Sequence, residues 1–136
     1  MRDALADFGA LSLATKDVAV YGADQLDLAT IDSNFRYSQH QPGGNGLCVV
    51  FVPATDFSTV DGIIPFIEGD GDSAFGSATT LVTGEQRTAP DAGDRIVLPL
   101  PPRCERFIRV GATPKSSGTF TAETVYAYLE HGVNPQ

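Results

Sequence analysis

The segment Leu47–Val52 constrains the fold of this chain most, because it is apolar on both sides of the strand that it would form. Successive side chains of a strand point to opposite faces of a sheet. The odd-numbered residues of this segment therefore share one side and the even-numbered residues share the other. A small β-sandwich needs only one apolar side per strand. We expect the second side to be covered by a loop, by the N-terminal segment or by another subunit, which indicates a protein that packs against other protein.

The rest of the chain has the pattern of short strands between turn-forming residues. Strands are expected over residues 18–21, 25–31, 47–52, 62–68, 78–83, 95–100, 106–111 and 119–131. About eight strands at this spacing are typical of an antiparallel sandwich or barrel, and the absence of a βαβ rhythm argues against a parallel sheet. The fold class is predicted to be all-β, an antiparallel β-sandwich. Pro65 inside one expected strand indicates an edge position or a bulge.

The N-terminal part fits this pattern least well. Leu5, Phe8 and Leu11 could line one face of a short helix over residues 1–13, but the segment is short and Gly9 interrupts it. We prefer an extended N-terminal arm. The expected division is an arm over residues 1–23 and a sandwich domain over residues 24–136.

Size and charge exclude several classes of protein. A chain of 136 residues is most simply one domain and can bury a core without disulfides or metals. Its net charge of -8 repels phosphate, so nucleic-acid binding is not expected. No segment approaches the roughly 18 continuous apolar residues of a membrane span, and the first ten residues lack the apolar core of a secretory signal.

The sequence offers little for catalysis. Glu68, Asp70 and Asp72 resemble part of a calcium loop, but the bidentate Glu at its end is missing, and Asp-Gly turns are common for backbone reasons. Neither His40 nor His131 belongs to a His-x-His pair, and no Gly-x-Ser-x-Gly or phosphate-binding loop occurs. We therefore expect no enzyme activity, no cofactor and no metal.

The two cysteines, Cys48 and Cys104, sit in or beside strand-like runs. Two small buried apolar residues are the favoured interpretation, and a disulfide between them is the alternative.

Two more expected strands carry bulky side chains on both sides. Glu105, Phe107 and Arg109 share one side of their strand, which is either a polar-rimmed interface or a solvated face with one exposed aromatic residue. Tyr126 and Tyr128 share a side opposite the apolar residues of the last strand. Three strands with this property favour a contact surface.

The order of these segments resembles the jelly-roll capsid cement (decoration) proteins of tailed bacteriophages. The resemblance covers roughly residues 47 to 129 and depends on order and spacing. It is carried by Leu47–Val52, Glu68–Phe75, Ala78–Leu81, Arg95–Pro102, Glu105–Val110 and Ser117–Val125. It implies a jelly roll that forms a homotrimer on the outer surface of an icosahedral phage head, is assembled in the host cytoplasm, and bridges copies of the major capsid protein to stabilise the shell.

Two sets of candidate residues follow from this interpretation. The expected subunit interface consists of Cys48, Val50, Val52, Glu105, Phe107, Arg109, Tyr126 and Tyr128. The expected capsid-binding residues are Leu11, Leu13, Val18, Val20, Tyr21, Phe35, Tyr37 and His40.

Two other classes of function remain as alternatives. A carbohydrate-binding jelly roll for host attachment would use loop aromatics, for which Tyr21, Phe35 and Tyr37 are the candidates. A sandwich-fold enzyme is the less favoured one, because no catalytic constellation accompanies the fold pattern.

Overall fold

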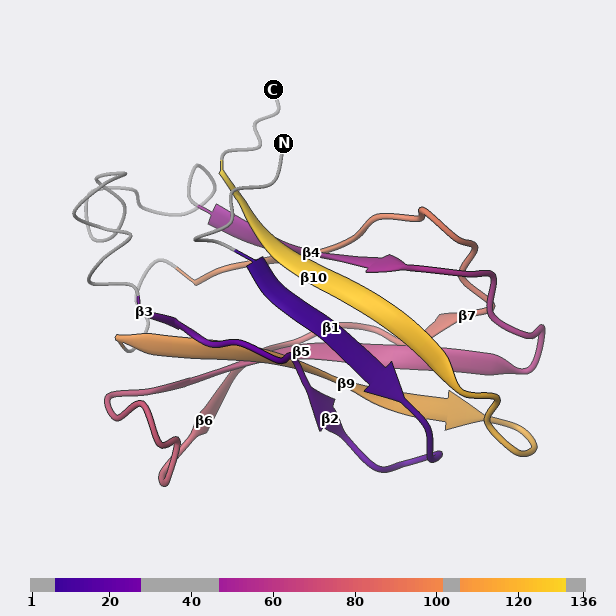
Figure 1. The fold of residues 1–136 in the computed structure, drawn as a ribbon, viewed down its shortest axis with the longest axis horizontal. Coiled ribbons are helices and arrows are strands. Elements are labelled where there is room, and N and C mark those ends of the chain that lie inside the picture. The colour runs from indigo at the N-terminus through magenta and orange to yellow at the C-terminus, as the bar shows by residue number, and fades with distance from the viewer. Residues whose placement is uncertain (1–6, 28–46, 102–105, 132–136) are drawn as a thin grey trace.

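The computed structural model of the protein describes residues 7–27, 47–101 and 106–131. These residues form ten strands and no helix, and the strands make two antiparallel sheets (Figure 1). The all-β fold class and the β-sandwich architecture are therefore confirmed. The expected strands over residues 47–52, 62–68, 78–83 and 95–100 are all present within a few residues of their predicted bounds.

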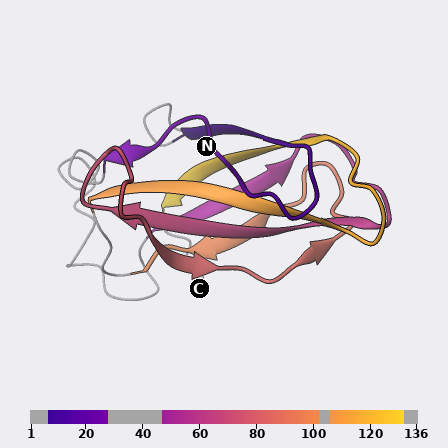
Figure 2. The same cartoon turned by 90° about the horizontal axis from the view of Figure 1, so that it is seen from below.

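The smaller sheet has four strands, and the larger sheet has six. In spatial order the four-stranded sheet consists of β1 (Asp7–Leu13), β10 (Glu123–His131), β4 (Leu47–Pro53) and β8 (Ile96–Pro99). The main path of the six-stranded sheet is β2 (Val20–Tyr21), β9 (Phe107–Ser116), β5 (Asp61–Asp70) and β6 (Thr79–Thr83). Two short strands complete it: β3 (Leu26–Asp27) pairs with β9, and β7 (Arg87–Thr88) pairs with β5. Figure 2 shows β5 and β9 running side by side along the molecule.

The core fills the space between the two sheets. Alternate residues of each long strand point inward, as the two-residue period of a strand requires. Members of this core include Val49, Phe51, Ile63, Ile67, Ile108, Val110, Val125, Ala127 and Leu129. The odd-numbered side of Leu47–Val52 is therefore the core side, at least at Val49 and Phe51. Cys48 and Val50 are buried as well but do not belong to this core cluster, so they lie on the other face of the sheet.

The segment expected as an arm is a strand in its described part. β1 pairs with β10 from Asp7 to Leu13, and it contributes Phe8, Leu11 and Leu13 to the core. A register shift between Asp7 and Gly9 places Phe8 and Leu11 on the same side although they are three residues apart. Gly9 adopts a positive φ of 84° at this bulge, which a glycine tolerates without strain. The bulge explains why the spacing resembled a helix, and the division at residue 23 does not separate an arm from the sandwich.

Pro65 lies in an internal strand and not in an edge strand. β5 has β9 on one side and both β6 and β7 on the other. β6 pairs with residues 66–69 of β5 and β7 pairs with residues 62–63, so Pro65 falls in the gap between them. The missing N–H of proline is tolerated where the ladder is interrupted. The backbone N–H of Gly84 closes this gap with a 2.8 Å hydrogen bond to the Pro65 carbonyl oxygen.

Candidate interaction surfaces

The outer face of the four-stranded sheet carries an apolar strip. Tyr126 is opposite Val52, and Val50 lies between Tyr128 of β10 and Val97 of β8. All five side chains point away from the core, because their neighbours along each strand point into it. Tyr126 keeps 41% of its surface exposed and Val97 keeps 47%, whereas Val50 is fully buried. The exposed part of the strip therefore lies on both sides of a covered centre.

Arg95 covers that centre. It immediately precedes β8, and its guanidinium reaches β10 on the far side of β4. Nη1 donates a 3.1 Å hydrogen bond to the Tyr128 hydroxyl, and Nη2 forms a 2.7 Å ion pair with the Glu130 carboxylate. Because β4 lies between β8 and β10, the stem of Arg95 must cross the outward residues of β4. We call this crossing the Arg95 strap.

The Arg95–Glu130 ion pair of the strap lies near Cys48, which is a free, buried thiol. Burial raises the pKa of the Cys48 thiol above its ordinary value, the Glu130 carboxylate raises it further, and the nearby Arg95 charge lowers it. A thiol with a raised pKa carries little thiolate at neutral pH and is a poor nucleophile. Cys48 is thus part of the packing on this face. Cys104 lies outside the described residues.

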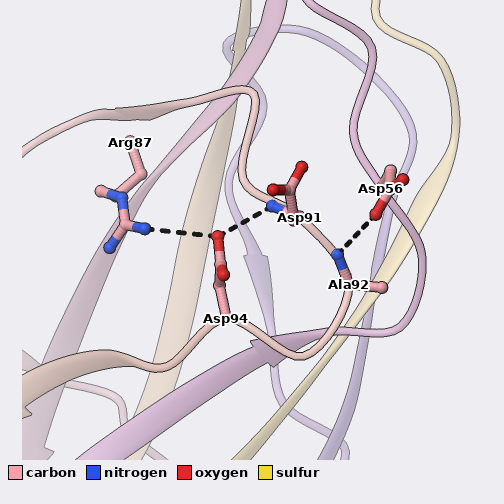
Figure 3. Close-up of polar contacts among 5 residues, drawn as sticks. All are labelled: Asp56, Arg87, Asp91, Ala92 and Asp94. Carbon is pink, nitrogen blue, oxygen red and sulfur yellow. Dashed lines mark hydrogen bonds and ion pairs between the residues drawn. The ribbon is translucent and has the colours of Figure 1, made fainter.

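Hydrogen bonds and one ion pair hold two loops together next to Arg95, and we call this set of contacts the clasp. The clasp fixes the backbone position at which the Arg95 strap starts. The Asp94 carboxylate accepts a 2.9 Å hydrogen bond from the Asp91 N–H and pairs with Arg87 at 3.5 Å, and the Asp56 carboxylate accepts a 2.8 Å bond from the Ala92 N–H (Figure 3). Backbone hydrogen bonds from residues 57 and 93 to residues 90 and 53 join the same two loops. Because Asp94 immediately precedes Arg95, this clasp fixes the point from which the strap crosses the sheet.

The even-numbered side of Leu47–Val52 is therefore largely covered by the protein itself. The sequence suggested that a loop, the N-terminal segment or a second subunit would cover it. The Arg95 stem crosses this side and Tyr128 lies beside Val50, and a long arginine stem can bury apolar surface while its charged end stays paired at the rim. The need for a partner at Val50 and Cys48 is removed, and the exposed apolar side chains that remain are Val97 and Tyr126.

The outer face of the six-stranded sheet is covered by a stack of side chains. The Arg109 guanidinium lies 4.0 Å from the centre of the Tyr21 ring and 4.6 Å from that of Phe75. Its Nε and Nη2 contact one carboxylate oxygen of Glu68 at 2.9 and 2.8 Å. Tyr21 also contacts Phe66 edge to face, with ring centres 5.8 Å apart. Arg109 is paired with Glu68 on this face, and the Phe66 and Phe75 rings are buried, whereas Tyr21 keeps 40% of its surface exposed.

A glycine makes this stack possible. The Phe66 ring lies against the backbone of Gly111, where a Cβ atom would overlap the ring and approach the Val20 carbonyl oxygen to 2.8 Å. Phe75 adopts a positive φ of 55°, which is rare for a bulky residue, and its buried ring contacts Arg109. The turn that carries Phe75 is stabilised by carboxylates: Asp70 accepts hydrogen bonds from the N–H groups of residues 72 and 77.

These turn carboxylates are the ones that resembled a calcium loop. Asp70 uses both oxygens on backbone N–H groups, and Asp72 accepts a 3.0 Å bond from the Ala74 N–H. Such pairing is what Asp residues provide in turns. Among the described residues no three His, Cys, Asp or Glu side chains are grouped so that they could hold a metal ion.

The structure divides the expected subunit interface between two opposite faces. Cys48, Val50, Val52, Tyr126 and Tyr128 lie on the outer face of the four-stranded sheet, and Phe107 and Arg109 lie on the outer face of the other sheet. Glu105 lies outside the described residues. One flat contact cannot include both groups, because the core separates them.

The expected capsid-binding residues are scattered as well. Leu11 and Leu13 are buried in the core and are not available to a partner, which corrects their assignment. Val20 packs against the core and Tyr21 belongs to the Arg109 stack. Val18 is exposed on the loop before β2. Phe35, Tyr37 and His40 lie outside the described residues.

Sequence reasoning did not assign Arg95, Val97, Glu68 or Phe75 to a contact surface. The alternation of residues 95–100 puts Arg95 and Val97 on the side opposite the apolar residues 96, 98 and 100, so their outward position could have been found. The hydrogen-bond partners of Arg95 and Arg109 could not, because they are 33 to 41 residues away along the chain.

No family model matches this chain, and no curated protein is significantly similar to it. The part of the chain that the structure describes holds no helix with the length and apolarity that a bilayer crossing requires.

Proposed function

We propose that this protein is a structural, non-catalytic component of a tailed-phage virion, a capsid cement protein that binds the outer surface of the head. One observation supports the proposal best. The two sheets close a complete core within one chain, yet the outer face of the four-stranded sheet leaves Val97 and Tyr126 exposed on the two sides of the Arg95 strap. Single exposed apolar side chains are ordinary, whereas two large ones on the same flat sheet face support a protein contact there.

The proposed mechanism is mechanical. The sandwich acts as a rigid body that bridges copies of the major capsid protein and resists outward pressure on the shell. As a homotrimer with jelly-roll connections, it would hold several weak shell contacts at once, and each contact then gains strength from the high effective concentration of the others. The acidic surface, with a net charge of -8, agrees with a position outside the shell and away from packaged DNA.

The test is a binding experiment with heads of the phage that encodes this chain, assembled without it. Purified protein is added and the heads are pelleted, imaged by electron microscopy and heated until DNA is released. We expect saturable binding, density on the outer surface that bridges capsid subunits, and release of DNA at a higher temperature. Heads that bind no protein, or that bind it without any change in release temperature, would contradict the cement function.

Carbohydrate binding is the other candidate, and the described residues favour it less. Tyr21 has one ring face covered by Arg109, so it is not a free platform for a sugar. A polar hollow of about 390 Å³ opens beside β5, β7 and β9, and no aromatic side chain lines it. Its lining residues are Thr59, Val60, Gln86, Thr88, Lys115, Ser116 and Ser117. A glycan array that gave a saturable hit with no head binding would favour this alternative.

A further inference from the structure

The edges of both sheets are poorly suited to pairing with another chain. In the four-stranded sheet, the edge strand β1 is interrupted by the bulge at Gly9, and the edge strand β8 is four residues long and contains Pro99. In the other sheet, β6 is irregular at Leu81, where its register with β5 shifts, and β2, β3 and β7 have two residues each. Bulges, prolines and short strands are the devices that prevent edge-to-edge pairing. A partner of the described part of the chain is therefore expected on a face.

The two outer faces differ in what they leave free. On the six-stranded sheet, Arg109, Tyr21, Phe75 and Glu68 are engaged with one another. On the four-stranded sheet, the Arg95 strap covers the centre, and Val97 and Tyr126 remain exposed on its two sides. Tyr21 on the first face keeps 40% of its surface exposed, but its ring is stacked against the Arg109 guanidinium, whereas the second face leaves both Val97 and Tyr126 exposed.

We propose that this face of the four-stranded sheet, centred on Val97 and Tyr126, is where two copies of the chain meet. The proposal deepens the proposed function by naming the self-contact, and it rests on that function for its setting. The pairing of the charges on this face favours a second copy of the chain as the partner that covers it. Each copy carries a net charge of -8, but the charges of Arg95 and Glu130 on this face are paired at 2.7 Å. Two such faces meet without like-charge repulsion at the contact, whereas a basic partner would be drawn to the carboxylates of the loops.

The size of the face predicts a weak contact. Four strands at a spacing of about 4.8 Å and about seven residues at 3.3 Å each give a face of roughly 450 Å². A stable complex typically buries about 800 Å² on each partner. We therefore expect association at high protein concentration, or on a scaffold that holds several copies close together, and a monomer in dilute solution.

The experiment combines sedimentation velocity with ¹⁹F NMR on the full chain. Sedimentation from about 5 μM to about 1 mM measures whether the mass rises above the 14.4 kDa of one copy.

Val97→Lys and Tyr126→Lys should weaken association at least tenfold, because each places an unpaired charge in an apolar contact. Val60→Lys is the matched control: Val60 is 46% exposed, almost as much as Val97, but lies in the turn immediately before β5 of the other sheet. Near-ultraviolet circular dichroism checks that each variant is folded.

The NMR measurement needs no substitution on the face. With 3-fluorotyrosine at all four tyrosines, the Tyr126 resonance should shift as concentration rises, while that of Tyr21 should not. The two rings have nearly equal exposure, 41% and 40%, so solvent access alone cannot separate them.

Each outcome separates this inference from the proposed function. A strict monomer up to 1 mM, or association that both lysine variants leave unchanged, would overturn the inference, while head binding by that monomer would still support cementing. A species of twice the monomer mass that depends on Val97 and Tyr126 supports the inference and speaks against the homotrimer. A species of three times the monomer mass with the same dependence supports both.

Discussion

Two arginine side chains decide how the outer faces of this sandwich are covered. Arg109 stabilises the six-stranded sheet through Glu68 and two aromatic rings, and Arg95 covers the centre of the four-stranded sheet through Tyr128 and Glu130. In both cases the guanidinium is paired with a carboxylate. The flat guanidinium of Arg109 and the aliphatic stem of Arg95 shield apolar surface. An arginine is suited to this because it combines a planar charged end with a long apolar stem.

Arg109→Ala should destabilise the protein by about 2–3 kcal/mol, because it removes two cation–π contacts and leaves the largely buried Glu68 carboxylate without its partner. Arg106→Ala is the matched control. Arg106 also pairs with a carboxylate, Asp27, and lies 4.9 Å from the Phe107 ring, but it is more exposed. We expect a loss of about 1 kcal/mol or less there. Urea unfolding measures both, and equal losses would contradict the role given to the stack.

Arg95→Ala should expose the Cys48 thiol. In a Cys104→Ser background, Cys48 should react slowly with a thiol reagent at pH 8, and the rate should still rise above pH 9, because burial raises the pKa of the thiol. Removing Arg95 also removes a charge that lowers this pKa, so a simple electrostatic effect would slow the reaction. We expect the opposite, an increase of about tenfold, because access dominates for a buried sulfur. A slower reaction in Arg95→Ala would mean that the strap does not cover Cys48.

At the scale of elements, β1 shows how a strand can be hidden in a sequence. A bulge near Gly9 changes the two-residue alternation, so Phe8 and Leu11 both reach the core. Leu11→Ala should therefore cost about 2–4 kcal/mol through the cavity that it leaves. Ser12→Ala, one residue further on an exposed position, should change stability by about 0.5 kcal/mol or less. If Leu11→Ala instead left the unfolding midpoint unchanged, β1 would be a detachable arm.

The contact of β9 with β5 and β2 depends on the absence of a side chain at Gly111. Gly111→Ala should destabilise the sandwich by about 2–3 kcal/mol, because the new methyl group overlaps the Phe66 ring and the β2 backbone. Gly118→Ala is the control, since a Cβ there meets no atom within 4 Å, and it should change stability by about 0.5 kcal/mol or less. Thermal unfolding of both variants measures the difference. Similar midpoints would show that Phe66 can move away at little cost.

The sequence predicted the long strands but not what covers their outer sides. A continuous apolar run identified β4, and alternation identified β8, whose inward residues repeat every second position. The two-residue strands β3 and β7 are too short to have a recognisable period. The covering of Val50 depends on Arg95 and Tyr128, which meet it only after three strands are aligned. An apolar second side was therefore interpreted as a missing partner when most of its cover comes from within the chain.

At the scale of the whole molecule, the pairing of charges on the two sheet faces suggests how the protein responds to salt. The described arginines 95, 106 and 109 each have a carboxylate partner on a sheet face, while carboxylates such as Asp72 and Asp91 lie at exposed loops. Copies with a net charge of -8 repel each other at long range, and this repulsion is screened over about 10 Å at 0.1 M salt. The contact itself, being apolar, is little weakened by salt.

Self-association should therefore become stronger as salt rises from about 20 mM to about 300 mM, because screening removes the repulsion between acidic copies and leaves the apolar contact intact. Sedimentation equilibrium at fixed protein concentration measures the effect. Val97→Lys tests its origin: the added positive charge reduces the net repulsion, yet association should stay weak at every salt concentration because an ammonium group lies in the contact. Association that falls with salt would instead mean that ion pairs between copies hold them together, and the face around Val97 and Tyr126 would not be the contact.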